Sequence, residues 1–111
     1  MFGFREDAIP TPCEPGVTRR ILVYSDQLMM CEISFEKGAE GNPHHHPHEQ
    51  ITYVGKGAFS FTVGEETKVV RAGDSVLMPP DVPHHVVCLE EGFLVDVFCP
   101  KRDDFLAALK K

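Results

Sequence analysis

The sequence PHHHPHEQ, residues 43–50, contains four of the six histidines of this 111-residue chain. The run is internal, Pro47 interrupts it, and the alternating sequence ITYV follows directly at residues 51–54. Imidazole nitrogens are the commonest protein ligands of divalent transition metals. A polar loop rich in histidine is the alternative explanation, but a second histidine motif far along the chain favours a metal site.

Side-chain alternation gives this stretch two different faces, because successive residues of an extended chain point to opposite sides. One face of a strand over residues 43–54 carries four possible ligands: His44, His46, His48 and Gln50. The other face carries His45 and Glu49. Although Pro47 disturbs the alternation, the pattern predicts a strand that enters a barrel with several ligands directed inward.

The composition is that of one compact domain with an ordinary core. Hydrophobic residues make up 42% of the chain and charged residues 25%, so the core does not need disulfide bonds for its stability. The net charge of −6 argues against nucleic acid and anionic membranes as partners. An anionic small molecule remains a possible ligand where the site itself is positive. No apolar run approaches the roughly 20 residues of a membrane span, and no signal-peptide pattern opens the sequence, so we expect a cytoplasmic protein.

The four cysteines, at positions 13, 31, 88 and 99, lie far apart and show no zinc-binding spacing. Cys31, Cys88 and Cys99 stand in apolar runs typical of strands, which predicts buried thiols. We expect a structural role for all four cysteines.

Turn sequences divide the chain into many short strands. Residues 1–18, with prolines at positions 10, 12 and 15, predict an extended arm, and residues 19–111 predict a barrel domain. Strands are expected at residues 19–25, 27–36, 43–54, 58–63, 67–71, 75–78, 84–89 and 93–98, with turns at residues 55–57 and 90–92. One helix is expected, at residues 103–109, where two aspartates suit its N-terminus. The pattern predicts a closed all-β architecture.

The spacing of the first histidine motif resembles that of the cupin superfamily, in which Gly, five residues, His-x-His, a Glu and a later Gly follow in order. Gly38, His44, His46 and Gly57 fall at these spacings, and Gln50 occupies the glutamate position. The resemblance implies a single-domain, cupin-type double-stranded β-helix, or jelly-roll barrel, with a short C-terminal helix.

The second cupin motif agrees with the first. Gly73, Pro79 and His84 match its spacing, whereas Asp81 and Cys88 replace its second Gly and its Asn. Two matching motifs separated along the chain make the resemblance specific, and they cover the sequence from residue 38 to residue 84.

The expected site is one divalent transition metal ion held by three imidazoles and one oxygen: His44, His46, His84 and Gln50. Glu49 is a rival oxygen ligand, but it is one residue off the family spacing and on the opposite strand face. His48 shares the inward face and is a rival to Gln50. His45 and His85 are expected beside the ligands or at the surface. Nickel, manganese, iron, cobalt and zinc all suit such a set, and a neutral amide makes the site more positive.

A third feature is Asp96, which interrupts the apolar sequence of residues 93–98. A buried carboxylate is costly unless it is paired or functional. A structural pair between Asp96 and Arg102, with Phe98 in the core, is one explanation. The other is a resemblance to KdgF-type cupins of pectin and alginate breakdown, which implies that Asp96, Phe98 and Arg102 line a catalytic site.

This resemblance implies an enzyme that converts cyclic 4,5-unsaturated uronates to linear keto sugars, with Asp96 moving a proton and Arg102 holding the carboxylate. The alternatives are oxygen chemistry at an iron site and a non-catalytic small-molecule-binding module. We also expect a homodimer, because the arm has no evident core role and the apolar strand at residues 19–25 needs a cover. Small cupins are generally dimeric, which the resemblance also implies.

Overall fold

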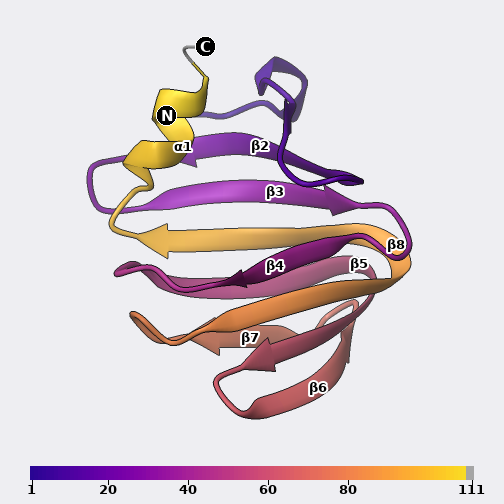
Figure 1. Ribbon diagram of the computed structural model, residues 1–111. Coiled ribbons are helices and arrows are strands. Elements are labelled where there is room, and N and C mark those ends of the chain that lie inside the picture. Colours follow the sequence, from indigo (N-terminus) through magenta and orange to yellow (C-terminus); the bar gives the residue numbers. More distant parts are fainter. Residues whose placement is uncertain (110–111) are drawn as a thin grey trace.

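The computed structural model describes residues 1–109, which form an all-β jelly roll with one short α-helix (Figure 1). A 3-10 helix, η1, at Arg5–Asp7 precedes the strands. The strands are β1 (Thr11–Pro12), β2 (Val17–Tyr24), β3 (Met29–Phe35), β4 (Glu40–His44), β5 (Glu49–Val63), β6 (Glu66–Arg71), β7 (Ser75–Met78) and β8 (His84–Cys99). Helix α1 follows at Asp103–Ala108. The predicted all-β class and C-terminal helix are confirmed.

The sheet is antiparallel, and its order along the main path is β1-β2-β3-β8-β5-β6. Strand β4 pairs with β8, and β7 pairs with β5. Strands β5 and β8 pair along their whole length, from Glu49 opposite Cys99 to Val63 opposite His84. Figure 1 shows these long strands curving. The bend divides the sheet into two layers: β2, β3 and β7 pair around one half of the β5–β8 ladder, and β4 and β6 pair around the other half.

The two turns predicted at residues 55–57 and 90–92 are wrong, because both segments continue a strand. They lie opposite each other in the β5–β8 ladder, where the register shifts between Val54 and Phe59. Gly57 has a φ of 90°, and a Cβ on Gly92 would lie 1.9 Å from the carbonyl oxygen of Lys56. Such glycine bulges bend paired strands without ending them.

The single strand predicted over residues 43–54 is also wrong. Strand β4 ends at His44, residues 45–48 form a loop, and β5 begins at Glu49. The loop lets His46 turn inward, where it is 7% exposed, while Pro47 faces solvent. Alternation along one continuous strand therefore does not explain how these histidines converge.

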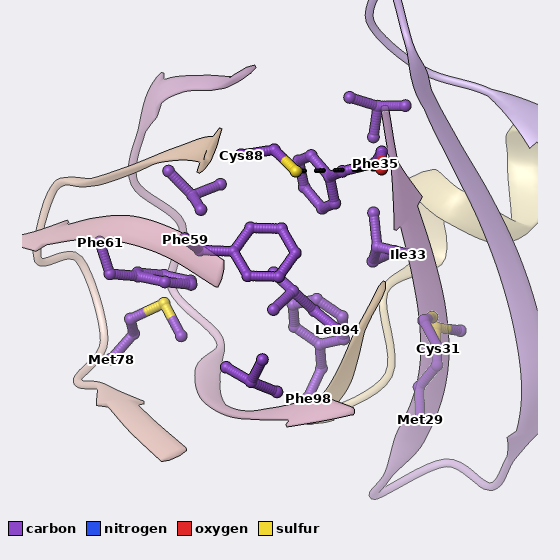
Figure 2. Close-up of a cluster of buried hydrophobic side chains, with 13 residues drawn as sticks. Met29, Cys31, Ile33, Phe35, Phe59, Phe61, Met78, Cys88, Leu94 and Phe98 are labelled. Atoms are coloured by element: carbon purple, nitrogen blue, oxygen red, sulfur yellow. Dashed lines mark hydrogen bonds between the residues drawn. The ribbon is translucent and has the colours of Figure 1, made fainter. Parts of the chain in front are cut away.

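The core lies between the two layers and is built from inward residues of β3, β5, β7 and β8 (Figure 2). Phe59 lies near its centre, and its ring meets Phe35 edge to face at 5.3 Å. Cys31 and Cys88 are buried there, as predicted. The prediction of a buried Cys99 is wrong, because Phe98 occupies the inward position at the end of β8 and Cys99 faces out.

The N-terminal arm packs on its own domain. Strand β1 pairs with β2 through Thr11 opposite Arg19, and Arg5 forms an ion pair with Glu32 at 2.9 Å. Strand β2 begins at Val17, which is part of the core. No helix within residues 1–109 is long and apolar enough to cross a membrane.

The outer face of the sheet carries a row of apolar side chains, which we call the outer apolar row. The row crosses five strands, because its members are register partners: Val23, Met30, Val97, Ile51 and Leu77. Ile51 and Leu77 are each more than half exposed. An exposed, contiguous apolar face of this kind is typical of an association surface.

We predict that the chain forms a homodimer through the outer apolar row. Light scattering at micromolar concentration should give a mass near twice 12.4 kDa for the wild type. Ile51→Asp should give a monomer, because it places a charge within the row that the partner chain would bury. Val69→Asp is the matched control, since Val69 is 46% exposed on β6 and outside the row. A monomeric wild type would contradict the prediction.

Candidate metal centre

Three histidines from three segments converge at one end of the fold. His44 ends β4, His84 begins β8, and the two are register partners. His46 comes from the loop after β4, and its ring centroid lies 5.0 Å from that of His84. One ring nitrogen from each histidine lies within 4.8 Å of the other two. The structure thus brings together the three imidazoles that the motif spacing predicts.

Each of the three rings is oriented by a backbone carbonyl two residues away. The Nδ1 atoms contact the carbonyl oxygens at 2.6 Å for His44, 2.9 Å for His46 and 3.1 Å for His84. The partners are the carbonyls of Asn42, His48 and Val82. A carbonyl oxygen only accepts, so Nδ1 carries the proton and Nε2 keeps its lone pair. Metal-bound histidines are held in this way.

His84 supplies the clearest sign that the cluster suits a cation. Its Nε2 is buried and has no hydrogen-bond partner among residues 1–109. Burial lowers the pKa of His84 to about 4 and also lowers the pKa of His46. Both rings are therefore neutral at pH 7 and present free lone pairs, which fits a divalent transition metal ion.

Gln50 fits the same ion as an oxygen ligand. The side chain is 5% exposed, and its Oε1 lies 3.0 Å from Nε2 of His46. A neutral imidazole has one N–H, so His46 cannot donate to both the His48 carbonyl and Gln50. A cation bound to Nε2 and Oε1 would stabilise this arrangement, in which two lone pairs face each other.

The rival ligands lie elsewhere. Glu49 is exposed on the outward face of β5, where it pairs in register with Cys99. His48 is half-buried, and its Nε2 lies 3.2 Å from the carbonyl oxygen of Lys101, outside the three-histidine cluster. The contacts favour Gln50 over both, and the full ligand set remains a proposal.

The remaining two histidines contact acidic side chains at the surface. Nδ1 of His45 lies 3.8 Å from Asp81, and both side chains are largely exposed. Nε2 of His85 lies 3.0 Å from Glu40. His45 and His85 therefore lie outside the three-histidine cluster.

Asp96 lies on the inward face of β8 and is connected to Gln50 through Thr52. The Thr52 hydroxyl donates to Oδ1 of Asp96 at 2.6 Å, and Nε2 of Gln50 donates to the Thr52 hydroxyl at 3.1 Å. Burial raises the pKa of Asp96 to about 6. Sequence reasoning missed Thr52, although a polar residue two positions after Gln50, on the same strand face, is a usable signal.

Arg102 is not paired with Asp96, so the predicted structural pair between them is absent among the described residues. Its Nε and one terminal nitrogen donate to the two carboxylate oxygens of Asp104, at 2.9 and 2.8 Å. Its guanidinium lies over the rings of Phe98 and Phe105, 5.0 and 4.0 Å from their centroids. Sequence reasoning missed the Asp104 partner because both residues flank the start of α1, where helix capping explains the acid equally well.

One cavity of about 410 Å³ connects these groups, a size typical of small-molecule sites. Its wall includes two of the three cluster histidines, His44 and His84, together with Gln50 and all three predicted catalytic side chains, Asp96, Phe98 and Arg102. The cavity can therefore place a bound molecule next to both the metal-ligand cluster and a buried carboxyl group.

Comparison with known proteins agrees with this geometry. The model of the cupin domain matches residues 31–98. This chain belongs to the cupin family. The pectin degradation protein KdgF of Dickeya dadantii is 45% identical over 93 residues, which are 82% of this chain and 84% of that protein. The predicted likeness to KdgF-type cupins is confirmed.

Solved cupin structures superpose closely on this chain. An RmlC-like cupin from Shewanella frigidimarina has a TM-score of 0.90 at 42% identity and covers 94% of each chain. The structure of KdgF from Halomonas sp. has a TM-score of 0.89 at 34% identity and covers 95% of this chain and 97% of that one. The predicted cupin architecture is confirmed.

We predict that His84→Ala loses bound metal. The wild type should carry one divalent ion per chain in elemental analysis after purification without added metal. Removing a ligand should weaken binding by more than the roughly 10- to 100-fold that loss of a ligand's hydrogen-bond partner costs. His45→Ala is the matched control, because its exposed ring lies outside the cluster. Equal metal content in all three proteins would contradict the prediction.

Asp96→Asn should stabilise the metal-free protein more at pH 7 than at pH 4. The pKa of Asp96 rises from 3.8 to about 6 on folding, so only the folded chain holds this proton between those values. The wild type therefore loses stability as pH rises from about 4 to 6, whereas the amide does not titrate. The pKa difference corresponds to about 3 kcal/mol. Denaturant unfolding after chelation measures it, and a pH-independent difference between the variants would contradict it.

Proposed function

We propose that this chain is a metal-dependent enzyme that converts 4,5-unsaturated uronates to linear keto sugars. The observation that carries the proposal is the position of Asp96, a buried carboxyl group that lines the same cavity as His44 and His84 of the three-histidine cluster. The 45% identity to a pectin degradation protein supports a uronate as the substrate. The cavity size suits a single sugar acid.

The proposed ligands are His44, His46, His84 and Gln50, all with free lone pairs or oxygens directed to one point. When bound, a divalent ion supplies a positive charge that polarises a substrate oxygen. The Nδ1 contacts fix the three rings, so little reorientation is needed on binding. The neutral amide of Gln50 leaves more positive charge for an anionic substrate than a glutamate would.

Asp96 is the proposed acid–base group. A carboxyl group whose pKa is about 6 can both hold and release a proton near neutral pH. Thr52 donates to Oδ1, which leaves Oδ2 as the oxygen for proton transfer to or from the sugar. Because Thr52 also accepts from Gln50, the carboxyl group is held in a fixed orientation relative to the ligand cluster.

Arg102 and Phe98 are proposed to position the sugar. The fork from Arg102 to Asp104 uses two of the five N–H groups of the guanidinium, so three remain for substrate oxygens. Phe98 is 2% exposed, and its ring packs against that of His46 with centroids 5.8 Å apart. Phe98 therefore forms a rigid apolar wall between the ligand cluster and Arg102.

We predict that metal-loaded wild type accelerates the decay of the ultraviolet absorbance of a 4,5-unsaturated uronate beyond its spontaneous rate. Asp96→Asn should lower the rate roughly 10²-fold or more, because the amide keeps the shape and the Thr52 contact but cannot transfer a proton. Asp103→Asn is the matched control, since it removes the same charge from an exposed site on α1. Metal content should be the same in all three proteins.

The two possible failures of this experiment have different meanings. No acceleration by the metal-loaded wild type would remove the uronate assignment and favour oxygen chemistry or simple binding at the same site. Acceleration that survives in Asp96→Asn would keep the activity and place the proton transfer on another group.

A further inference from the structure

Arg19 is a charged residue on the core-facing side of β2. Its neighbours on that face are Val17, which is buried, and Ile21, which packs against the core. The register partners of these three residues on β3 are all buried and apolar: Phe35, Ile33 and Cys31. The guanidinium therefore enters the molecule between apolar neighbours, where an arginine without a partner is costly.

The Arg19 guanidinium reaches the same cavity as the metal-ligand cluster. It lies 3.7 Å from the ring centroid of Phe105, and the guanidinium of Arg102 lies 4.0 Å from the same centroid. Both guanidiniums therefore pack against Phe105, whose negative ring faces favour cations. Phe105 thus holds two cationic groups at the cavity wall.

The two arginines differ in their partners. Arg102 is neutralised by its fork with Asp104. Arg19 takes part in no ion pair within residues 1–109, although Glu14 lines the same cavity. Nε of Arg19 is buried and has no hydrogen-bond partner among those residues. An unpaired buried donor on a cation costs more than a neutral one, so this arginine favours an anionic ligand.

We propose that Arg19 is the principal contact for the substrate carboxylate, with a contribution from Arg102, which packs against the same Phe105 ring. The identity of that carboxylate as a uronate rests on the proposed function. A guanidinium matches a carboxylate with two parallel hydrogen bonds, which suits a donor that has no protein acceptor. Arg19 supplies uncompensated positive charge in a chain whose net charge is −6, and so selects acidic sugars over neutral ones.

The test compares an acidic sugar with its neutral parent. Isothermal titration of metal-loaded protein with D-galacturonate and with D-galactose measures the preference for a carboxylate independently of turnover. The wild type should bind galacturonate about tenfold or more tightly than galactose, as expected for charge-assisted hydrogen bonds. Arg19→Gln should remove this preference, and it should raise KM for the unsaturated uronate far more than it lowers kcat.

Arg20→Gln is the matched control. It removes the same charge from the adjacent residue of β2, which does not line the cavity. This variant should keep the preference for galacturonate and the wild-type KM. Arg19→Lys keeps the charge but loses the planar fork, so it should bind galacturonate with intermediate strength. This variant tests the role of Arg19 if Arg19→Gln does not fold.

The outcomes separate this inference from the proposed reaction. A wild type that prefers galacturonate through Arg19 but does not accelerate uronate decay would overturn the reaction and support the carboxylate site. A wild type with no preference for galacturonate, including no measurable binding of either sugar, would overturn the role of Arg19. The role of Arg19 would also be overturned if Arg19→Gln had the same affinity for galacturonate and the same KM as Arg20→Gln. If Arg19→Gln does not fold, Arg19→Lys takes its place in this comparison.

Discussion

The continuous pairing of β5 with β8 is the constraint on which the rest of this structure depends. The ladder sets Thr52 directly opposite Asp96 and Gln50 directly opposite Phe98. Since register partners in an antiparallel pair share a face, these four side chains all point inward, and Gln50, Asp96 and Phe98 line the cavity. A slip by one residue in either strand would turn its whole set outward and remove the site. The glycine bulges at the bend are therefore as important to the site as the residues that line it.

Much of this arrangement follows from the sequence. The spacing of Gly38, His44, His46 and His84 predicts both the fold and the meeting of three imidazoles, because that spacing matches the two cupin motifs. Alternation predicts that Asp96 and Phe98 point inward while Glu49 points out. These predictions succeed because they depend on local periodicity, which a sequence records directly.

The parts that could not be predicted depend on contacts between distant residues. Glycine is typical of both turns and β-bulges, so the sequence at residues 55–57 and 90–92 also fits chain reversals until the opposite strand is known. The pairing of Arg102 with Asp104 rather than with Asp96 depends on where α1 packs. Arg19 is predicted only as the first residue of the apolar strand at residues 19–25, although its position between Val17 and Ile21 is a usable signal of an inward-facing charge. A charged residue on the inward, apolar face of β2 indicates a functional site, as Asp96 does on β8, because an unpaired charge is costly there.

The histidine contacts have a consequence for how this cavity changes over evolutionary time. Each ring is oriented by a carbonyl only two residues away in its own segment, at Asn42, His48 or Val82. None of these contacts involves the side chains that give the cavity its acid, its apolar wall or its positive charge. Substitution of those side chains leaves the three carbonyl contacts in place. One scaffold can therefore acquire new substrates while its ligand cluster stays unchanged.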